Sequence, residues 1–187
     1  MNNIKLKFDN DGFIVNENLI NQSDLEAIEK WISELNDSKE VNHHYEKTVN
    51  GKVLSRTENF VSSHTSFREF LLSSSIKDYL TMLFDDEPIL FKEKINYKYP
   101  GGAGYAPHQD APAYPFGKKH ITMLLAIDDS DINNGCLEFA RGRNNEGIIN
   151  IDKKGCIDSL TAEKFVWEKI PLKLSLIHIS EPTRLQD

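Results

Sequence analysis

The fold of this chain is constrained most by the order of its hydrophobic patterns, which are helical before Pro88 and strand-like after it. Before Pro88, apolar residues recur at helical spacing in three stretches, at residues 25–35, 67–71 and 76–83. After Pro88, short apolar or alternating segments are separated by turns rich in Gly, Asp and Asn. Helices followed by short strands predict an α+β chain, mainly β, whose core is a sandwich or barrel.

The individual elements follow from the same patterns. The sequence Ser23-Asp24-Leu25-Glu26 is typical of a capping box at the start of the first long helix. Residues 40–59 are polar and irregular, which indicates a loop with a strand or two. The expected strands are residues 13–15, 89–99, 107–110, 120–127, 136–140, 148–151 and 165–170.

The composition narrows the class of protein. A chain of 187 residues with 39% hydrophobic and 27% charged residues is typical of one soluble globular domain. A net charge of -7 argues against nucleic acid and a membrane surface as partners. The two cysteines, Cys136 and Cys156, are too few for a disulfide framework, and no apolar signal stretch opens the chain. We therefore expect a cytoplasmic protein.

The candidate metal ligands lie in Pro107-His108-Gln109-Asp110, after the glycine-rich turn at residues 100–104. On a strand, residues i and i+2 project from the same face, so His108 and Asp110 would point at the same place. They would supply two of the three ligands in a 2-His-1-carboxylate iron site. Taken alone, however, the pair is better explained as a histidine hydrogen-bonded to a nearby carboxylate.

Several motifs in a fixed order strengthen the metal interpretation. They are Lys94-x-Asn96-x-Lys98, Pro100-Gly101-Gly102, the His108–Asp110 segment, the apolar strand ending at Asp129, and Asn134-Gly135-Cys136-Leu137. Together they resemble the phytanoyl-CoA dioxygenase (PhyH-like) family of Fe(II)/2-oxoglutarate oxygenases over most of residues 8–172. The resemblance implies a double-stranded β-helix, a cupin-like jelly roll, with N-terminal helices packed on it.

The resemblance also implies roles for particular residues. His108 and Asp110 would bind Fe(II), and a later histidine and arginine would complete the iron site and hold 2-oxoglutarate. Lys94 and Asn96 would line the cosubstrate pocket, although a solvated strand face is the favoured explanation because a face with three lysines is usually exposed to water. Leu124 takes the place of a tryptophan found near the cosubstrate in many relatives. A retained Asp110 implies hydroxylation of a small-molecule substrate with O2, rather than halogenation.

The last residues require a separate interpretation. Leu174–Arg184 resembles one reading frame of a transposon-based sequencing adapter, so we expect 174–187 to be non-native and the domain to be residues 1–173. His178 and Arg184 are therefore rejected as the missing histidine and arginine. On this interpretation the closing C-terminal strands of the jelly roll are missing, and the fragment aggregates and is inactive.

Three functions stay open at this point. The parent protein could be a 2-oxoglutarate-dependent hydroxylase, or it could be a metal-binding cupin-like isomerase or binding module that does not use 2-oxoglutarate. The chain as given could be an inactive fragment of either. Residues beyond Lys173 would discriminate between them. Arg56 and Glu58 are better explained by a structural role than by substrate binding, because we expect them to form a surface ion pair.

Overall fold

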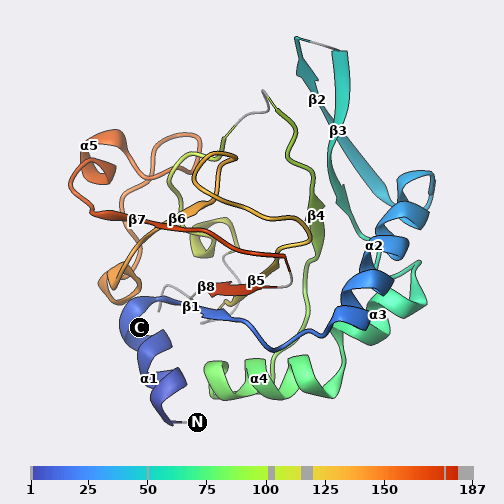
Figure 1. The fold of residues 1–187 in the computed structure, drawn as a ribbon. Helices are drawn as coiled ribbons and strands as arrows, with labels where there is room; N and C mark the ends of the chain where they lie inside the picture. Colours follow the sequence, from blue (N-terminus) through green and yellow to red (C-terminus); the bar gives the residue numbers. More distant parts are fainter. Residues whose placement is uncertain (1, 50, 101–103, 115–119, 175, 181–187) are drawn as a thin grey trace. The chain divides into compact units, whose positions relative to one another are not determined.

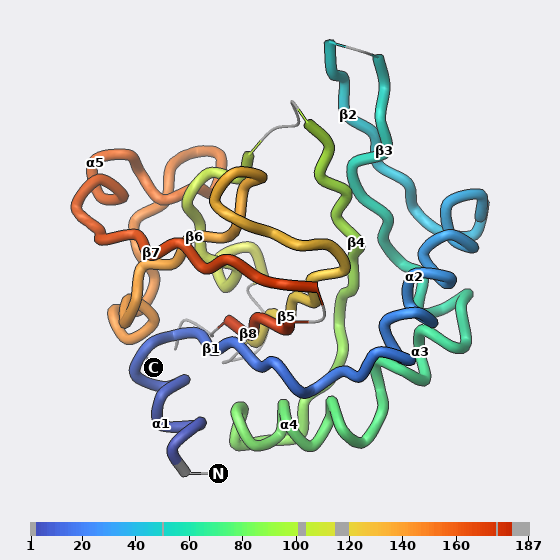
Figure 2. Tube along the Cα trace, viewed as in Figure 1, coloured from blue at the N-terminus to red at the C-terminus, as the bar shows by residue number. Residues whose placement is uncertain are grey.

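The computed structural model describes residues 2–49, 51–100, 104–114, 120–174 and 176–180 (Figure 1). They divide into two compact units, which can be followed along the trace in Figure 2. The first unit is Met1–Ile20, Met82–Phe84 and Tyr105–Asp187, and the second is Asn21–Thr81 and Asp85–Gly104. In the described ranges, no helix is long and apolar enough to cross a membrane.

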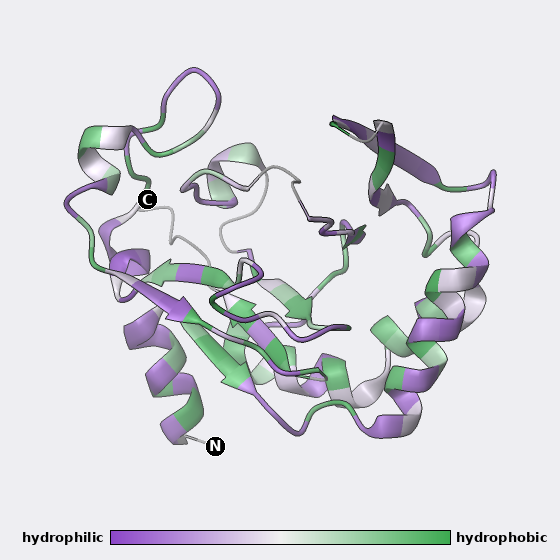
Figure 3. Ribbon diagram, turned by 45° about the horizontal axis from the view of Figure 1, so that its top comes forward, coloured by the Kyte–Doolittle hydropathy of each residue, from purple (hydrophilic) through white to green (hydrophobic). Residues whose placement is uncertain are grey.

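The first unit contains two antiparallel sheets. One has the order β1-β8-β5, formed by Phe13–Asn16, Ile177–Ser180 and Thr122–Leu125. The other pairs β6, Leu137–Ala140, with β7, Trp167–Ile170. Apolar side chains from both sheets form one core, and Figure 3 shows green, apolar residues along these strands. The core consists of Phe13, Val15, Leu124, Ala126, Phe139, Ile170, Leu172 and Leu176. Strands β5 to β8, all after Pro88, thus combine with β1 into two sheets that share one core, whereas the expected strand at residues 89–99 does not belong to these sheets.

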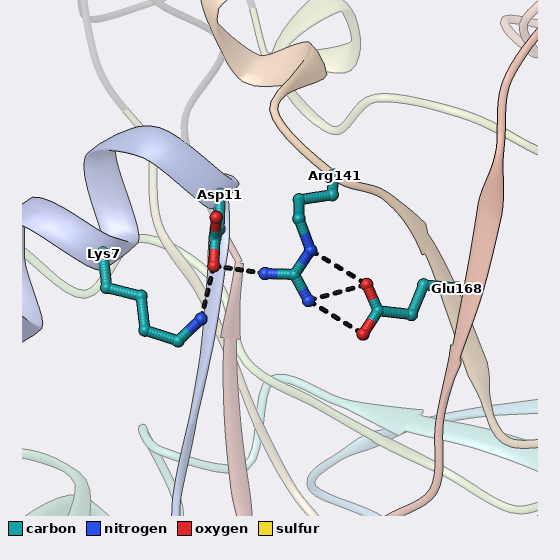
Figure 4. A network of polar contacts seen from close by, with 4 residues as sticks. All are labelled: Lys7, Asp11, Arg141 and Glu168. Carbon is teal, nitrogen blue, oxygen red and sulfur yellow. Dashed lines mark hydrogen bonds and ion pairs between the residues drawn. The ribbon is translucent and has the colours of Figure 1, made fainter.

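An N-terminal helix, α1 (Asn2–Asp11), precedes β1 and was not expected from the sequence. Figure 4 shows how its last residue is attached to the second sheet: the Arg141 guanidinium bonds Asp11 and forks onto Glu168 of β7. The Nε–Oε2 and Nη2–Oε1 distances to Glu168 are 2.9 and 2.8 Å. Lys7 also bonds Asp11, and the guanidinium lies 4.8 Å from the centre of the Phe13 ring. This network connects helix, sheet and core.

Gly12 ends α1, and its substitution by alanine is expected to destabilise the protein by about 1–3 kcal/mol. Its φ is +82°, and a Cβ at this position would lie 2.9 Å from Oδ1 of Asn144. Gly155 has a φ of +80° with open space around it, so Gly155→Ala adds the backbone strain without the clash. Urea unfolding should therefore show a larger loss for Gly12→Ala than for Gly155→Ala. Equal losses would contradict the clash.

The second unit combines helices with a three-stranded sheet. Helices α2 (Gln22–Asn36), α3 (Thr65–Leu71) and α4 (Ser74–Phe84) match the three periodic stretches, although α4 ends in residues of the first unit. Strands β2 (Asn42–Thr48), β3 (Gly51–Glu58) and β4 (Lys94–Asn96) form the sheet. The expected capping box was placed wrongly: Asn21 caps α2, and Asp24 reciprocates. The two capping residues thus lie two positions earlier in the chain than Ser23 and Glu26.

Glu58 lies at the centre of a polar cluster on β3. Nε of Arg56, Nζ of Lys92 and Nε2 of His44 lie 3.0, 3.3 and 3.3 Å from its carboxylate oxygens. Burial would raise the pKa of Glu58, but the hydrogen bond from Lys92 and the neighbouring positive charges outweigh it, so the pKa is lowered. The ion pair with Arg56 is present, but its carboxylate is buried rather than at the surface. This setting favours a structural role.

The end of the described chain contributes the middle strand of a sheet. Residues Ile177–Ser180 form β8 between β1 and β5, with Ile177 and Ile179 fully buried. Residues 174–187 were expected to be a non-native tail, yet four of them pair with β1 and β5 in this sheet. Although apolar and polar side chains alternate in this strand, His178 is buried together with the two isoleucines, as in the middle strand of a covered sheet. Whether they are native stays a prediction, and Arg184 lies outside the described residues.

Candidate metal centre

The segment that carries His108 and Asp110 is irregular backbone, not the expected strand. Asp110 is helical (φ -73°, ψ -35°) and precedes a short 3-10 helix, η1, at Ala111–Ala113. The carbonyl of Pro107 accepts a bond from the N–H of Ile157 at 2.8 Å, which is a loop contact rather than a sheet ladder. Nevertheless, Nε2 of His108 lies 3.8 Å from Oδ1 of Asp110. The two side chains therefore lie close together as the sequence predicts, but an irregular loop rather than a strand brings them together.

The imidazole of His108 is oriented by its own backbone neighbour. Nδ1 lies 2.7 Å from the carbonyl oxygen of Ala106. A carbonyl only accepts hydrogen bonds, so Nδ1 carries the proton. In the neutral ring, Nε2 then keeps its lone pair and faces Asp110. Metal-binding histidines are usually fixed in this way by a bond at the other ring nitrogen.

Asp110 is oriented by a threonine on the neighbouring sheet. The hydroxyl of Thr122, on β5, donates to Oδ2 of Asp110 at 2.6 Å. The other oxygen, Oδ1, is the one near Nε2 of His108. One carboxylate oxygen is thus held by the protein, while the second can bind a cation. Thr122 was missed in the sequence because its partner is 12 residues away.

Removal of this hydroxyl should weaken the metal site. Thr122→Val keeps the shape of the side chain but leaves Oδ2 of Asp110 without its donor. Loss of such a partner typically lowers metal affinity by about 10–100-fold. Mn(II) titration of the variant should show this decrease, and Thr48→Val on β2 serves as the matched control. An unchanged affinity for Thr122→Val would show that the hydroxyl does not orient a ligand.

An imidazole nitrogen beside a carboxylate oxygen fits Fe(II) as two of its three protein ligands. Within the described ranges, no third His, Cys, Asp or Glu joins them in a group that could hold a metal. His178 is instead buried in the core, with its ring 4.1 Å from that of Phe139 and 5.6 Å from that of Phe13. The structure therefore does not bring His178 to the pair.

The residues expected to hold the cosubstrate belong to both units. Lys94 and Asn96 are exposed residues of β4, in the second unit, and their role stays a prediction. Leu124 lies on β5, two residues from Thr122, and packs against the apolar core of the first unit. Its proposed place beside 2-oxoglutarate is likewise a prediction.

A pocket of about 320 Å³ opens beside the pair. It is lined by Tyr105, Ala106, His108, Gln109, Asp110, Pro112, Ala113, Ile151, Lys154, Gly155 and Cys156. Gln109 holds the following loop: its Nε2 donates to the carbonyl of Gly147 at 3.1 Å, and its Oε1 accepts from the N–H of Ile149 at 2.8 Å. The residue between the two candidate ligands therefore positions the wall of the pocket.

Comparison with known proteins identifies the family of this chain. The family model for phytanoyl-CoA dioxygenase (PhyH) matches residues 8–169. The chain belongs to this family. It is a family of Fe/2-oxoglutarate dioxygenases, so the resemblance seen in the sequence motifs is confirmed.

Two curated relatives are similar over most of the chain. A methylphosphonate hydroxylase of Gimesia maris is 39% identical over 166 residues, which cover 87% of this chain and 64% of the relative. A 2-aminoethylphosphonate dioxygenase of an uncultured bacterium is 35% identical over 174 residues, covering 89% and 66%. The chain thus spans about two thirds of the length of these relatives.

Solved structures support the fold. The epimerase SnoN in complex with Fe3+, alpha ketoglutarate and nogalamycin RO has a TM-score of 0.82 at 16% identity, over 98% of this chain and 74% of that chain. EctD from S. alaskensis with 2-oxoglutarate and 5-hydroxyectoine gives 0.74 at 16% identity, over 95% and 66%. The mixed α+β fold therefore matches that of jelly-roll dioxygenases.

Proposed function

We propose that the parent protein is an Fe(II)- and 2-oxoglutarate-dependent hydroxylase of a small organic phosphonate. The observation that carries the proposal is the His108–Asp110 pair, whose Nε2 and Oδ1 face each other while their other polar atoms are held by the protein. The substrate class rests on the two phosphonate-acting relatives. It also agrees with the lysine on the wall of the pocket.

In the proposed enzyme, different residues would bind the metal, orient its ligands and contact the cosubstrate. His108 and Asp110 would hold the metal, which when bound supplies oxygen activation coupled to oxidative decarboxylation of 2-oxoglutarate. Ala106 and Thr122 fix the orientation of the two ligands, so that little reorganisation is needed on metal binding. Lys94 and Asn96 would contact the cosubstrate. The pocket beside the pair would hold the substrate.

The test is succinate release by the longer parent protein. We expect release from 2-oxoglutarate to require Fe(II) and to be stimulated by methylphosphonate, with one hydroxylated product formed per succinate. No stimulation by any of a panel of phosphonates would refute the substrate class. Metal-dependent turnover of a substrate without 2-oxoglutarate would instead support the cupin-like alternative.

We also propose that the 187-residue chain has little or no activity of its own. Its described residues contain two candidate metal ligands but no group of three that could hold a metal, and its curated relatives contain further sequence. Side-by-side assays of this chain and the parent should therefore show succinate release from the parent alone. Equal rates would refute this part of the proposal.

A further inference from the structure

We infer that Lys154 binds the anionic group of the substrate, an inference that rests on the proposed function. Lys154 lines the same pocket as His108 and Asp110. The other lining residues include Ala106, Pro112, Ala113 and Ile151, which are apolar, and Gln109, whose amide is already engaged. An anion in this pocket would therefore find one ammonium group in a pocket that His108 and Asp110 also line.

The backbone that carries Lys154 is well anchored. Ile151 and Ile157 form a β-bridge at the base of a hairpin, and the N–H of Ile157 bonds the carbonyl of Pro107 at 2.8 Å. At the tip, the N–H of Gly155 bonds the carbonyl of Asp152 at 3.0 Å, with the glycine at a φ of +80°. The hairpin is thus bonded to Pro107, the residue directly before His108. This attachment places the lysine reproducibly beside the metal pair.

The ammonium group of Lys154 is available for a ligand. The nearest carboxylate along the chain, Asp152, uses Oδ1 to accept the backbone N–H groups of Lys154 and Cys156 at 2.8 and 3.0 Å. Among the residues that the structure describes, no ion pair engages the Lys154 side chain. Asp110, the carboxylate that lines the pocket, is held by Thr122 and faces His108. The lysine charge is therefore not neutralised within the pocket.

The adjacent residue, Lys153, is a matched control for Lys154. Lys153 and Lys154 are both exposed on this hairpin, but only Lys154 lines the pocket. Both residues contribute the same charge to the surface, so any long-range effect on an anion should be similar for both. A direct contact with the ligand should depend on Lys154 alone. A phosphonate bound to Lys154 would lie in the pocket that His108 and Asp110 also line.

Binding of methylphosphonate to the full 187-residue chain, measured by calorimetry with Mn(II) present, tests this inference. Lys154→Met should weaken binding about tenfold, as expected for loss of one hydrogen bond to a charged group. Lys153→Met should leave it unchanged, and neither variant should alter binding of the neutral ester dimethyl methylphosphonate. Similar affinities for the Lys154→Met and unmodified chains, equal weakening by both variants, or no binding to the unmodified chain would overturn the inference.

Turnover by the parent protein separates this inference from the proposed function. Loss of binding in Lys154→Met with no methylphosphonate-stimulated succinate release would uphold the anion site and refute the proposed hydroxylation. Stimulated release that is unaffected by Lys154→Met, in both KM and kcat, would uphold the hydroxylation and overturn the anion site. The expected result is a raised KM with a smaller change in kcat.

Discussion

Replacing His108 with alanine is expected to lower Fe(II)-dependent succinate release by the parent protein more than about a hundredfold. The substitution removes Nε2, the nitrogen that faces Asp110 and keeps its lone pair. Loss of a partner that merely orients a metal ligand already costs about 10–100-fold, and loss of the ligand itself should cost more. The side chain of His108 is 44% exposed, so its removal leaves no core cavity.

The assay needs a histidine control and a folding control. His44→Ala removes a similarly exposed imidazole that contacts Glu58 in the second unit, and it should retain turnover. Thermal unfolding of the His108→Ala protein should stay within a few degrees of the unmodified protein. A well-folded His108→Ala variant with turnover within about threefold of normal would mean that His108 does not bind the metal.

The helices and the candidate ligand pair could be predicted because their signals are local. The buried stripe of Leu25, Ile28 and Leu35 identifies α2 from spacing alone. By contrast, α1 is largely polar, and its stability depends on contacts far along the chain. Asn144, for example, donates to the carbonyl of Asp9 at 3.0 Å from 135 residues away. A contact between residues so far apart cannot be predicted from the sequence pattern of the helix itself.

The surroundings of the candidate ligands His108 and Asp110 were less predictable, because they depend on contacts that are distant in sequence. The sequence indicates that His108 and Asp110 act together, but a strand was wrongly expected beneath them. The backbone instead bonds the 151–157 hairpin, and Gln109 reaches Ile149, 40 residues away. Thr122 and Lys154 likewise belong to elements whose proximity depends on the tertiary fold. Motif spacing identifies candidate ligands, whereas their supporting contacts require the structure.

Acidification should destabilise this chain by an amount on the order of 3 kcal/mol through His178 alone. Burial lowers the pKa of His178 from 6.5 to about 4, and Nε2 has no hydrogen-bond partner among the described residues. Above pH 6.5 the ring is neutral in both states, so the contribution is fully present. As the pH falls from 6.5 towards 4, the unfolded chain binds a proton that the folded chain excludes, and the stability is lost.

Comparison with His178→Leu isolates this effect from the titration of the carboxylates. Leucine removes the titrating ring and keeps an apolar side chain against Phe13 and Phe139. Urea unfolding at pH 7.5 and pH 4.5 should therefore show a smaller loss of stability for His178→Leu than for the unmodified chain. Equal losses in the two proteins would mean that His178 is not buried as a neutral ring. Because β8 pairs with both β1 and β5, protonation of this one side chain should weaken the whole three-stranded sheet.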